Sequence, residues 1–124
     1  MTPSRTLQVL VVDDNADGRE MLKTVLVMQG HNVDEAEDGI TAVERALESC
    51  CFDVAIIDIG LPGFDGYEVA RRIRAGSNGN VAKLIALTGY GQEEDRRVAL
   101  AAGFDEHLVK PVDPDVLSKL FASL

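Results

Sequence analysis

Short runs of apolar, largely β-branched residues are the feature of this 124-residue chain that most constrains its fold. The runs at 7–12, 54–57 and 81–87 are nearly continuous, which is typical of parallel strands covered on both faces. Two weaker runs, at 31–36 and 106–109, are half-polar or shorter, and we expect the first of them to lie near a sheet edge. The sequence therefore predicts five strands, with the first run in a central position.

A helical pattern of apolar residues follows each of the first three strands. The first helix is ended by Gly30, and its buried stripe is expected to contain Met21, Leu22, Val25, Leu26 and Met28. The second helix is marked by Ile40, Val43, Leu47 and Cys50. In the third, three arginines are expected to face water while the residues that face inward are Val69, Ala70 and Ile73.

The last two helices differ in how firmly we expect them to pack. The helix from about Gln92 to Ala102 is polar and charged, and it would bury only small residues together with Val98 and Leu100. It should therefore be loosely held. The final helix has a cap and a proline at its first position, in Asp113-Pro114, and its apolar residues are Val116, Leu117, Leu120 and Phe121.

Five strands alternating with five helices through short connections predict a doubly wound α/β fold with a parallel sheet. We expect the flavodoxin-like (βα)5 arrangement, with strand order 2-1-3-4-5. The length fits a single domain over residues 1–124, with its core from about residue 7 and a flexible N-terminal segment at 1–6. We expect the last helix to continue through Phe121 to Leu124, and therefore expect no effector domain within these residues.

Composition excludes several classes of protein. A net charge of −9 and a pI near 4.5 argue against nucleic-acid binding, which needs a basic surface. No apolar run approaches the roughly 20 residues of a membrane helix, and residues 1–6 precede no signal-peptide core. Cys50 and Cys51 are neighbours that are poorly placed to bridge each other. We expect a cytoplasmic protein without a disulfide framework.

Polar residues stand at the carboxyl ends of four of the expected strands: Asp13 and Asp14, Asp58, Thr88 and Lys110. In a parallel sheet these ends meet along one edge, where such folds bind ligands. Clustered carboxylates stay ionised beside a divalent cation or an ammonium group, and Mg²⁺ suits all-oxygen ligation by few protein groups. A carboxylate nucleophile, a metal, a hydroxyl and a lysine are together the parts needed for phosphoryl transfer onto an aspartate.

Each of these residues also has a purely structural interpretation. Asp58 alone would be a turn former, and we expect one of Asp13 and Asp14 to serve partly as a cap of the first helix. Thr88 and Lys110 alone carry little signal. The presence of compatible groups at four strand ends is what favours a functional site.

The motifs around these residues resemble the receiver domains of two-component response regulators. The resemblance covers nearly the whole chain, and it is as strong for receivers attached to hybrid histidine kinases as for separate regulators. It is carried by Val11-Val12-Asp13-Asp14-Asn15, Ile57-Asp58-Ile59-Gly60-Leu61-Pro62-Gly63-Phe64-Asp65-Gly66, Leu87-Thr88-Gly89 and Val109-Lys110-Pro111.

This resemblance implies that Asp58 is the phosphoacceptor, which receives a phosphoryl group from a phosphohistidine donor. Asp13 and Asp14 match the acids that bind Mg²⁺, directly or through water, with Asp58 and the backbone carbonyl of Gly60 as further ligands. Mn²⁺ could replace Mg²⁺. The residues matching the phosphoryl-binding and switch positions are Thr88, Gly89 and Lys110. The Lys110-Pro111 peptide bond is usually cis in the family, an isomer that proline makes accessible.

The resemblance also implies a signalling switch that catalyses its own phosphorylation and dephosphorylation. The expected partners are a histidine kinase or a histidine phosphotransfer protein, and a downstream protein or covalently attached domain. The surface that responds is formed by the fourth helix, fifth strand and fifth helix. His107 stands where the family usually has a switch Tyr or Phe, and an ordinary half-exposed strand histidine is an equally good interpretation of it. If it does act as the switch residue, its titration near pH 6 to 7 could make this surface pH-sensitive. Gly60 and Tyr90 occupy positions that tune the lifetime of the phosphoryl group.

Three alternatives were weighed against this interpretation. An EF-hand loop could begin at Asp13, but its twelfth position would be Thr24 instead of Glu, and a strand precedes it. A phosphatase of the haloacid-dehalogenase type has an acid two residues after its nucleophile, where this chain has Asn15. A receiver-like module that binds partners without phosphorylation would not need the full set of polar groups.

Overall fold

The computed structural model describes residues 6–48, 52–61, 63–76, 83–89, 93–110 and 112–123. Strands and helices alternate along the chain, and every expected element is present. In chain order they are β1 (Gln8–Val12), α1 (Ala16–Met28), β2 (Asn32–Ala36), α2 (Gly39–Glu48), β3 (Val54–Asp58), α3 (Gly66–Ala75), β4 (Lys83–Thr88), α4 (Glu93–Ala102), β5 (Glu106–Val109) and α5 (Pro114–Ala122).

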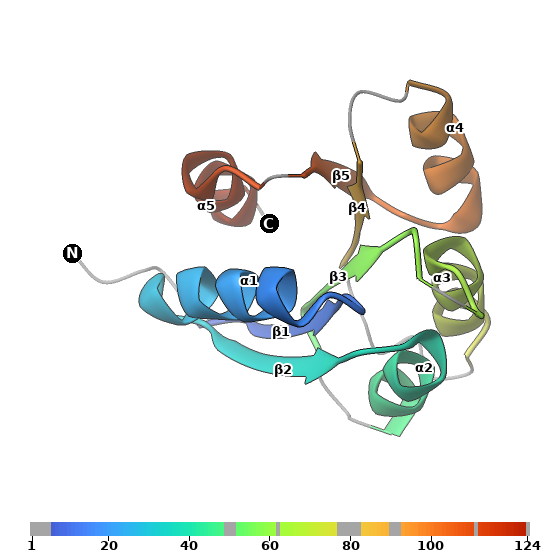
Figure 1. Ribbon diagram of the computed structural model, residues 1–124, viewed down its shortest axis with the longest axis horizontal. Coiled ribbons are helices and arrows are strands. Elements are labelled where there is room, and N and C mark those ends of the chain that lie inside the picture. Colours follow the sequence, from blue (N-terminus) through green and yellow to red (C-terminus); the bar gives the residue numbers. More distant parts are fainter. Residues whose placement is uncertain are drawn as a thin grey trace.

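The five strands form one parallel sheet in the order β2-β1-β3-β4-β5. Helices α1 and α5 cover one face of this sheet, and α2, α3 and α4 cover the other (Figure 1). The predicted flavodoxin-like architecture and strand order are therefore confirmed. Among the described residues, no helix combines the length and apolarity needed to cross a membrane.

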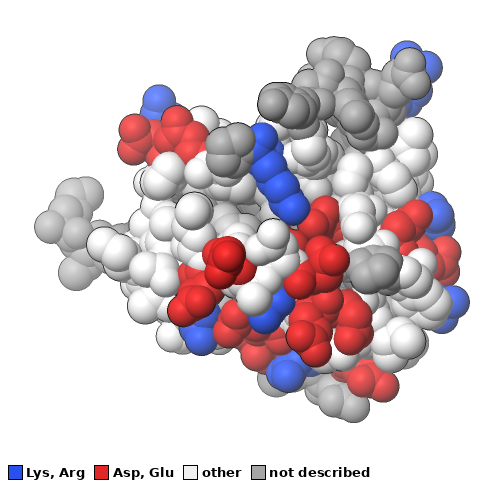
Figure 2. All heavy atoms as spheres, viewed as in Figure 1, with Lys and Arg blue, Asp and Glu red and all other residues white. Residues whose placement is uncertain are grey.

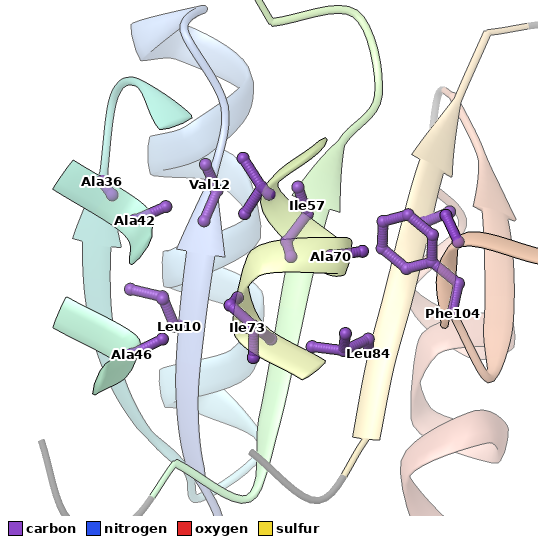
Figure 3. Packing of buried hydrophobic residues seen from close by; sticks show 14 of the residues in the cluster. Leu10, Val12, Ala36, Ala42, Ala46, Ile57, Ala70, Ile73, Leu84 and Phe104 are labelled. Carbon is purple, nitrogen blue, oxygen red and sulfur yellow. The ribbon is translucent and has the colours of Figure 1, made fainter. Parts of the chain in front are cut away.

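Two apolar clusters, one on each face, hold the helices to the sheet. The first joins side chains of β1 such as Leu10 and Val12 to Ala42 of α2 and Ile73 of α3 (Figure 3). The second packs β1 and β3 against Leu22, Leu26, Leu117 and Phe121 of α1 and α5. All five residues of β3 are buried, whereas β2 is half-polar at the sheet edge. Burial on both faces explains why the central strands are continuously apolar.

The predicted stripe of α1 was partly wrong. Leu22 and Leu26 are buried, but the side chains of Met21 and Met28 are 61% and 82% exposed. At 3.6 residues per turn the two methionines lie on one side of the helix, roughly 100° or more around its axis from Leu22. They belong to the flank of the stripe instead of its centre.

Two other helices differ from the predictions in the same way. Ile40 of α2 is exposed, as are Val98 and Leu100 of α4. The buried residues of these helices are mainly alanines: Ala42, Ala46, Ala99 and Ala102. A helix that contacts a sheet through alanine comes close to the strands, and larger residues then project to its sides. Helix α4 was expected to bury small residues together with Val98 and Leu100. The expectation is confirmed for the small residues Ala99 and Ala102 and was wrong for Val98 and Leu100.

The helix caps explain where α1, α3 and α5 begin. Asn15 caps α1 through a hydrogen bond that its side chain accepts from the Gly18 N–H at 3.1 Å. The expectation that Asp13 or Asp14 caps this helix was therefore wrong. Asp65 caps α3, and Asp113 caps α5 with Pro114 at the first helical position, as predicted. Capping by Asn15 leaves the acidic turn free for other contacts.

Several sequence-based expectations concern residues outside the described ranges. They are residues 1–5 of the expected flexible segment, the helix residue Cys50, the strand residues Val81 and Ala82, the helix start at Gln92, the lifetime position Tyr90, the peptide bond to Pro111, and the helix end at Leu124. These remain predictions.

His31 connects the start of β1 to α5, and this contact generates a pH prediction. Its Nδ1 accepts a hydrogen bond from the Leu7 N–H at 3.1 Å, and its ring centroid lies 5.2 Å from that of Phe121. Burial lowers the pKa of His31 below its ordinary value of 6.5. The unfolded chain therefore binds the proton more readily, and stability should be lost as the pH falls through about 6.5.

We expect the free energy of unfolding to fall between about pH 7 and about pH 5.5, and to fall less in His31→Asn. The Asn oxygen can accept the Leu7 N–H without titrating. Denaturant unfolding at each pH measures the difference. An equal fall in both proteins would show that His31 is not the titrating group.

Candidate functional site

Three carboxylates converge at the carboxyl edge of the sheet. Asp13 follows β1 and Asp58 ends β3, and these strands pair so that Val12 lies beside Ile57. Carboxylate oxygens of Asp13, Asp14 and Asp58 lie within 4.8 Å of one another. Asp13 and Asp58 are buried, whereas Asp14 is exposed. The structure thus brings together the three acids that the sequence placed at two separate strand ends.

Lys110 supplies the positive charge in this cluster. Its Nζ lies 2.7 Å from Asp58 Oδ2 and 3.5 Å from Asp13 Oδ2. Desolvation alone would lower the pKa of Lys110, but the hydrogen bond and negative charge of Asp58, together with Asp13, outweigh it and raise the pKa. The ammonium is therefore firmly charged and pairs with both buried carboxylates.

The pKa of the Asp13 carboxyl group shows the effect of crowding in the cluster. Burial raises the pKa of its carboxyl group, and the adjacent Asp58 carboxylate acts in the same direction. The Asn15 N–H, which donates to Asp13 Oδ1 at 3.0 Å, and the Lys110 ammonium act in the opposite direction but do not cancel the rise. Ionised Asp13 is thus disfavoured in the folded protein, as expected for crowded carboxylates in need of a cation.

The donor set fits a hard divalent cation. All three side chains offer oxygen, and the exposure of Asp14 leaves the cluster open to water, which Mg²⁺ usually retains. The Gly60 N–H donates to Asp58 Oδ1 at 2.8 Å, so the backbone of the following loop turns toward the acids. The role of the Gly60 carbonyl as a ligand remains a prediction.

The loop after Asp58 is closed by Gly66. The Gly66 N–H donates to the Ile59 carbonyl at 3.2 Å, and a Cβ at this position would lie 2.6 Å from the Asp58 carbonyl oxygen. No larger residue fits so near the backbone. Helix α3 consequently begins directly against the strand end that presents the Asp58 carboxylate.

Thr88 and Gly89 end β4 beside this cluster. The Thr88 hydroxyl is buried and donates to the Leu108 carbonyl at 3.3 Å, so it contacts β5 and not Asp58. Gly89 is exposed and lines a cavity of about 440 Å³. Asp13 and Lys110 line the polar side of this cavity, and its apolar side includes Met21, Leu22, Leu87 and Val112.

His107 lies away from the acids, on β5 beside Ala86 of β4. Its half-buried side chain lines a small cavity of about 50 Å³ together with Ala99 and Leu100 of α4. The structure therefore places His107 between β5 and α4, where a change in α4 would reach it. Its role in a switch is untested.

The geometry rejects the EF-hand alternative. Helix α1 begins at Ala16, so the residues that would supply the middle and end of a calcium loop, including Thr24, are helical. Asn15, which occupies the second acid position of a haloacid-dehalogenase phosphatase, is the helix cap. Neither alternative gains support from the structure.

One contact at the acidic turn was missed by the sequence analysis. Arg19 of α1 donates from Nη1 to the backbone carbonyl of Asp13 at 2.7 Å. Its side chain also pairs with Glu35 of β2 at 3.2 Å. In the sequence, this contact is indicated only by the opposite charges of Arg19, early in the first helix, and Glu35, near the end of the next strand. Acidic side chains gather on the surface over the start of α1 (Figure 2, in the view of Figure 1).

Comparison with known proteins places these residues in context. Residues 9–122 match the sequence model of the response regulator receiver domain. The transcriptional regulatory protein ResD of Bacillus subtilis is 37% identical over 114 residues, which cover 92% of this chain and 46% of ResD. The sensor protein EvgS of Escherichia coli K12 is 32% identical over 124 residues, which cover all of this chain and 10% of EvgS.

Solved structures agree with these matches. The receiver domain of a sensor histidine kinase from Pseudomonas aeruginosa, with a magnesium ion coordinated in its active-site cleft, superposes with a TM-score of 0.86. It is 33% identical, and the match covers 96% of this chain and 97% of that one. The chain thus resembles a complete receiver structure but spans less than half of ResD and a tenth of EvgS.

Asp13→Asn tests the electrostatics of the cluster. Because the pKa of Asp13 is raised in the folded state, the neutral side chain should stabilise the metal-free protein at neutral pH, by roughly 0.5–2 kcal/mol, the usual size of a stabilising substitution. The variant should also lose most of the stabilisation by Mg²⁺, since one carboxylate is gone. Denaturant unfolding with chelator or with Mg²⁺ measures both effects. Lower metal-free stability or undiminished stabilisation by Mg²⁺ would contradict this assignment.

Proposed function

The chain belongs to the response regulator receiver domain family of two-component systems, and we propose that its Asp58 accepts a phosphoryl group from a phosphohistidine donor. The observation that carries this proposal is the convergence of three carboxylates and Lys110 at one sheet edge. Asp58 is held there by the Gly60 N–H on one oxygen and by Lys110 on the other. A buried carboxylate fixed on both oxygens is oriented for attack on an approaching phosphorus.

In the transfer, an Asp58 oxygen forms a bond to phosphorus and the P–N bond of the donor breaks. The released imidazole takes a proton from solvent. Lys110 then pairs with the phosphoryl oxygens in place of the free carboxylate. Its charge therefore stabilises the Asp58 carboxylate before the transfer and the phosphoryl group after it. The cavity beside the site, with Gly89 and Lys110 on its polar side, suits the ring of a phosphohistidine.

A divalent cation completes this chemistry. Asp13, Asp14, Asp58 and the Gly60 carbonyl would hold Mg²⁺, with Mn²⁺ as a second candidate of similar ligand preference. When bound, the ion neutralises charge on the transferring phosphoryl oxygens. The raised pKa of Asp13 supports this proposal, because a crowded buried acid is the group that gains most from a cation.

The proposed response to phosphorylation passes through β4 and β5. Thr88 would exchange its hydrogen bond to Leu108 for one to the phosphoryl group, which would release a contact between these strands. Lys110, which immediately follows β5, would shift at the same time. The α4, β5 and α5 surface then repacks around His107. Gly60 and Tyr90 are proposed to tune the phosphoryl lifetime, and the peptide bond between Lys110 and Pro111 is proposed to be cis.

The partners follow from this role. A histidine kinase or a histidine phosphotransfer protein would donate the phosphoryl group, in the cytoplasm. The receiver would pass the signal to a separate protein or to an attached domain, and similarity to both ResD and EvgS keeps both arrangements open. The family match favours this role over that of a phosphatase.

Asp58→Ala tests the phosphoacceptor. Wild-type protein incubated with Mg²⁺ and a small acyl phosphate donor should gain one phosphoryl group by intact-protein mass spectrometry, and Asp58→Ala should gain none. Asp34→Asn is the matched control. Asp34 lies on the edge strand β2, outside the acid cluster, and its carboxylate pairs with Arg45 of α2. The proposal fails if wild type takes up no phosphoryl group or if Asp58→Ala takes it up equally.

Lys110→Ala tests the coupling between phosphorylation and structure. Mg²⁺ should still bind, because a competing cation has been removed and all the acids remain. The phosphorylation-dependent changes in NMR chemical shift in α4, β5 and α5 should be lost, because the link between Asp58 and the end of β5 is gone. Lys119→Ala, on the exposed side of α5, should keep them. An unchanged response in Lys110→Ala would refute the role of Lys110.

A further inference from the structure

The acidic turn between β1 and α1 is fixed by contacts on three sides of one residue. The Asp13 N–H donates to the Ala36 carbonyl of β2 at 3.2 Å, and Asp13 Oδ1 accepts from the Asn15 N–H at 3.0 Å. The third contact is the hydrogen bond from Arg19 Nη1 to the Asp13 carbonyl, the shortest of the three at 2.7 Å. This last one acts on the peptide that joins Asp13 to Asp14.

The orientation of that peptide decides where Asp14 points. Asp14 is exposed, and no described side chain hydrogen-bonds its carboxylate. Its position near Asp13 and Asp58 is therefore set by the backbone on its N-terminal side. Because the peptide is planar, a change in the ψ angle of Asp13 would turn the Asp13 carbonyl away from Arg19 and move the Cα and side chain of Asp14 away from the cluster.

Arg19 is itself held in place. Its side chain is only 17% exposed, and its Nε pairs with Glu35 Oε1 at 3.2 Å. Lys23, one turn later on α1, pairs with the other oxygen of Glu35 at 3.1 Å. The planar guanidinium can donate in two fixed directions at once, here to a strand carboxylate and to a backbone carbonyl.

We propose that Arg19 is a positioning residue for the metal site, which holds the Asp13–Asp14 peptide so that both carboxylates converge with Asp58. This inference rests on the proposed function of that site. It assigns a role to a residue that touches neither the cation nor the phosphoryl group. Partners that orient metal ligands typically change metal affinity by 10-fold to 100-fold when removed.

The direction in which Mg²⁺ affinity changes when Arg19 is removed distinguishes a positioning role from a purely electrostatic one. Arg19 carries a positive charge near three acids, so as a charge it opposes the binding of a cation. Removing it would then tighten Mg²⁺ binding. If Arg19 instead orients the ligands, its removal weakens binding in spite of the favourable change in charge.

Arg19→Met keeps an apolar stem and removes every donor. We expect its Mg²⁺ dissociation constant, from NMR titration, to rise about 10-fold. Arg45→Met is the matched control, because Arg45 also joins a helix to β2, through Asp34, and has no contact with the acidic turn. Its dissociation constant should stay near that of wild type. Unchanged or tighter binding in Arg19→Met overturns the proposal, as does equal weakening in both variants.

A readout without metal tests the contact itself. The carbonyl ¹³C resonance of Asp13 in the metal-free protein should move upfield in Arg19→Met and not in Arg45→Met, because the hydrogen bond to that carbonyl is lost. In wild type, the guanidinium resonances of Arg19 should report restricted rotation. An unmoved Asp13 carbonyl resonance in folded Arg19→Met would overturn the proposal. Rapidly averaged Arg19 resonances in wild type would also overturn it, and that measurement holds even if Arg19→Met does not fold.

The two hypotheses fail in different ways. Wild-type protein that binds no Mg²⁺ and takes up no phosphoryl group refutes the proposed function, while the metal-free carbonyl measurement still tests the contact made by Arg19. Wild-type protein that is phosphorylated normally, with unchanged Mg²⁺ affinity in Arg19→Met, refutes only the positioning role.

Discussion

Mutual repulsion among three carboxylates within 4.8 Å of one another is the constraint on which the site depends. The folded chain tolerates it because Lys110 places an ammonium between Asp58 and Asp13. The parallel sheet makes this arrangement possible, since it delivers the ends of β1, β3 and β5 to one edge. A stable apolar sheet, buried on both faces, thus holds in place a polar cluster that would not assemble by itself.

The same contacts connect the cluster to the strand pair β4–β5. The Lys110 N–H donates to the Thr88 carbonyl at 2.8 Å, and the Thr88 hydroxyl donates to Leu108. Any change in charge at Asp58 therefore acts on the β4–β5 pair. Among the described side chains of α4, the buried ones are Ala99 and Ala102, so we expect little apolar burial to oppose a displacement of this helix.

The sequence was sufficient for the sheet and the acid cluster, because continuous apolar runs and strand-end residues depend on local pattern and on topology. It was insufficient to predict which apolar residues at the sides of the helices are buried and which are exposed. Met21 and Met28 are apolar and correctly spaced with each other, yet lie off the buried stripe. It also missed Arg19, because a side chain that donates to a backbone carbonyl leaves no signature in the residue accepting it. The cap at Asn15 was hidden by two adjacent acids of similar capping tendency.

The central claim is that Asp58 carries the phosphoryl group. Hydride reduction of the phosphorylated protein converts an aspartyl phosphate to homoserine, and peptide mapping by tandem mass spectrometry then locates the converted residue. If Asp58 carries the phosphoryl group, homoserine should appear at position 58 only, and only when Mg²⁺ was present. Conversion at Asp13 or Asp14, or conversion at position 58 that is independent of the metal, would contradict it.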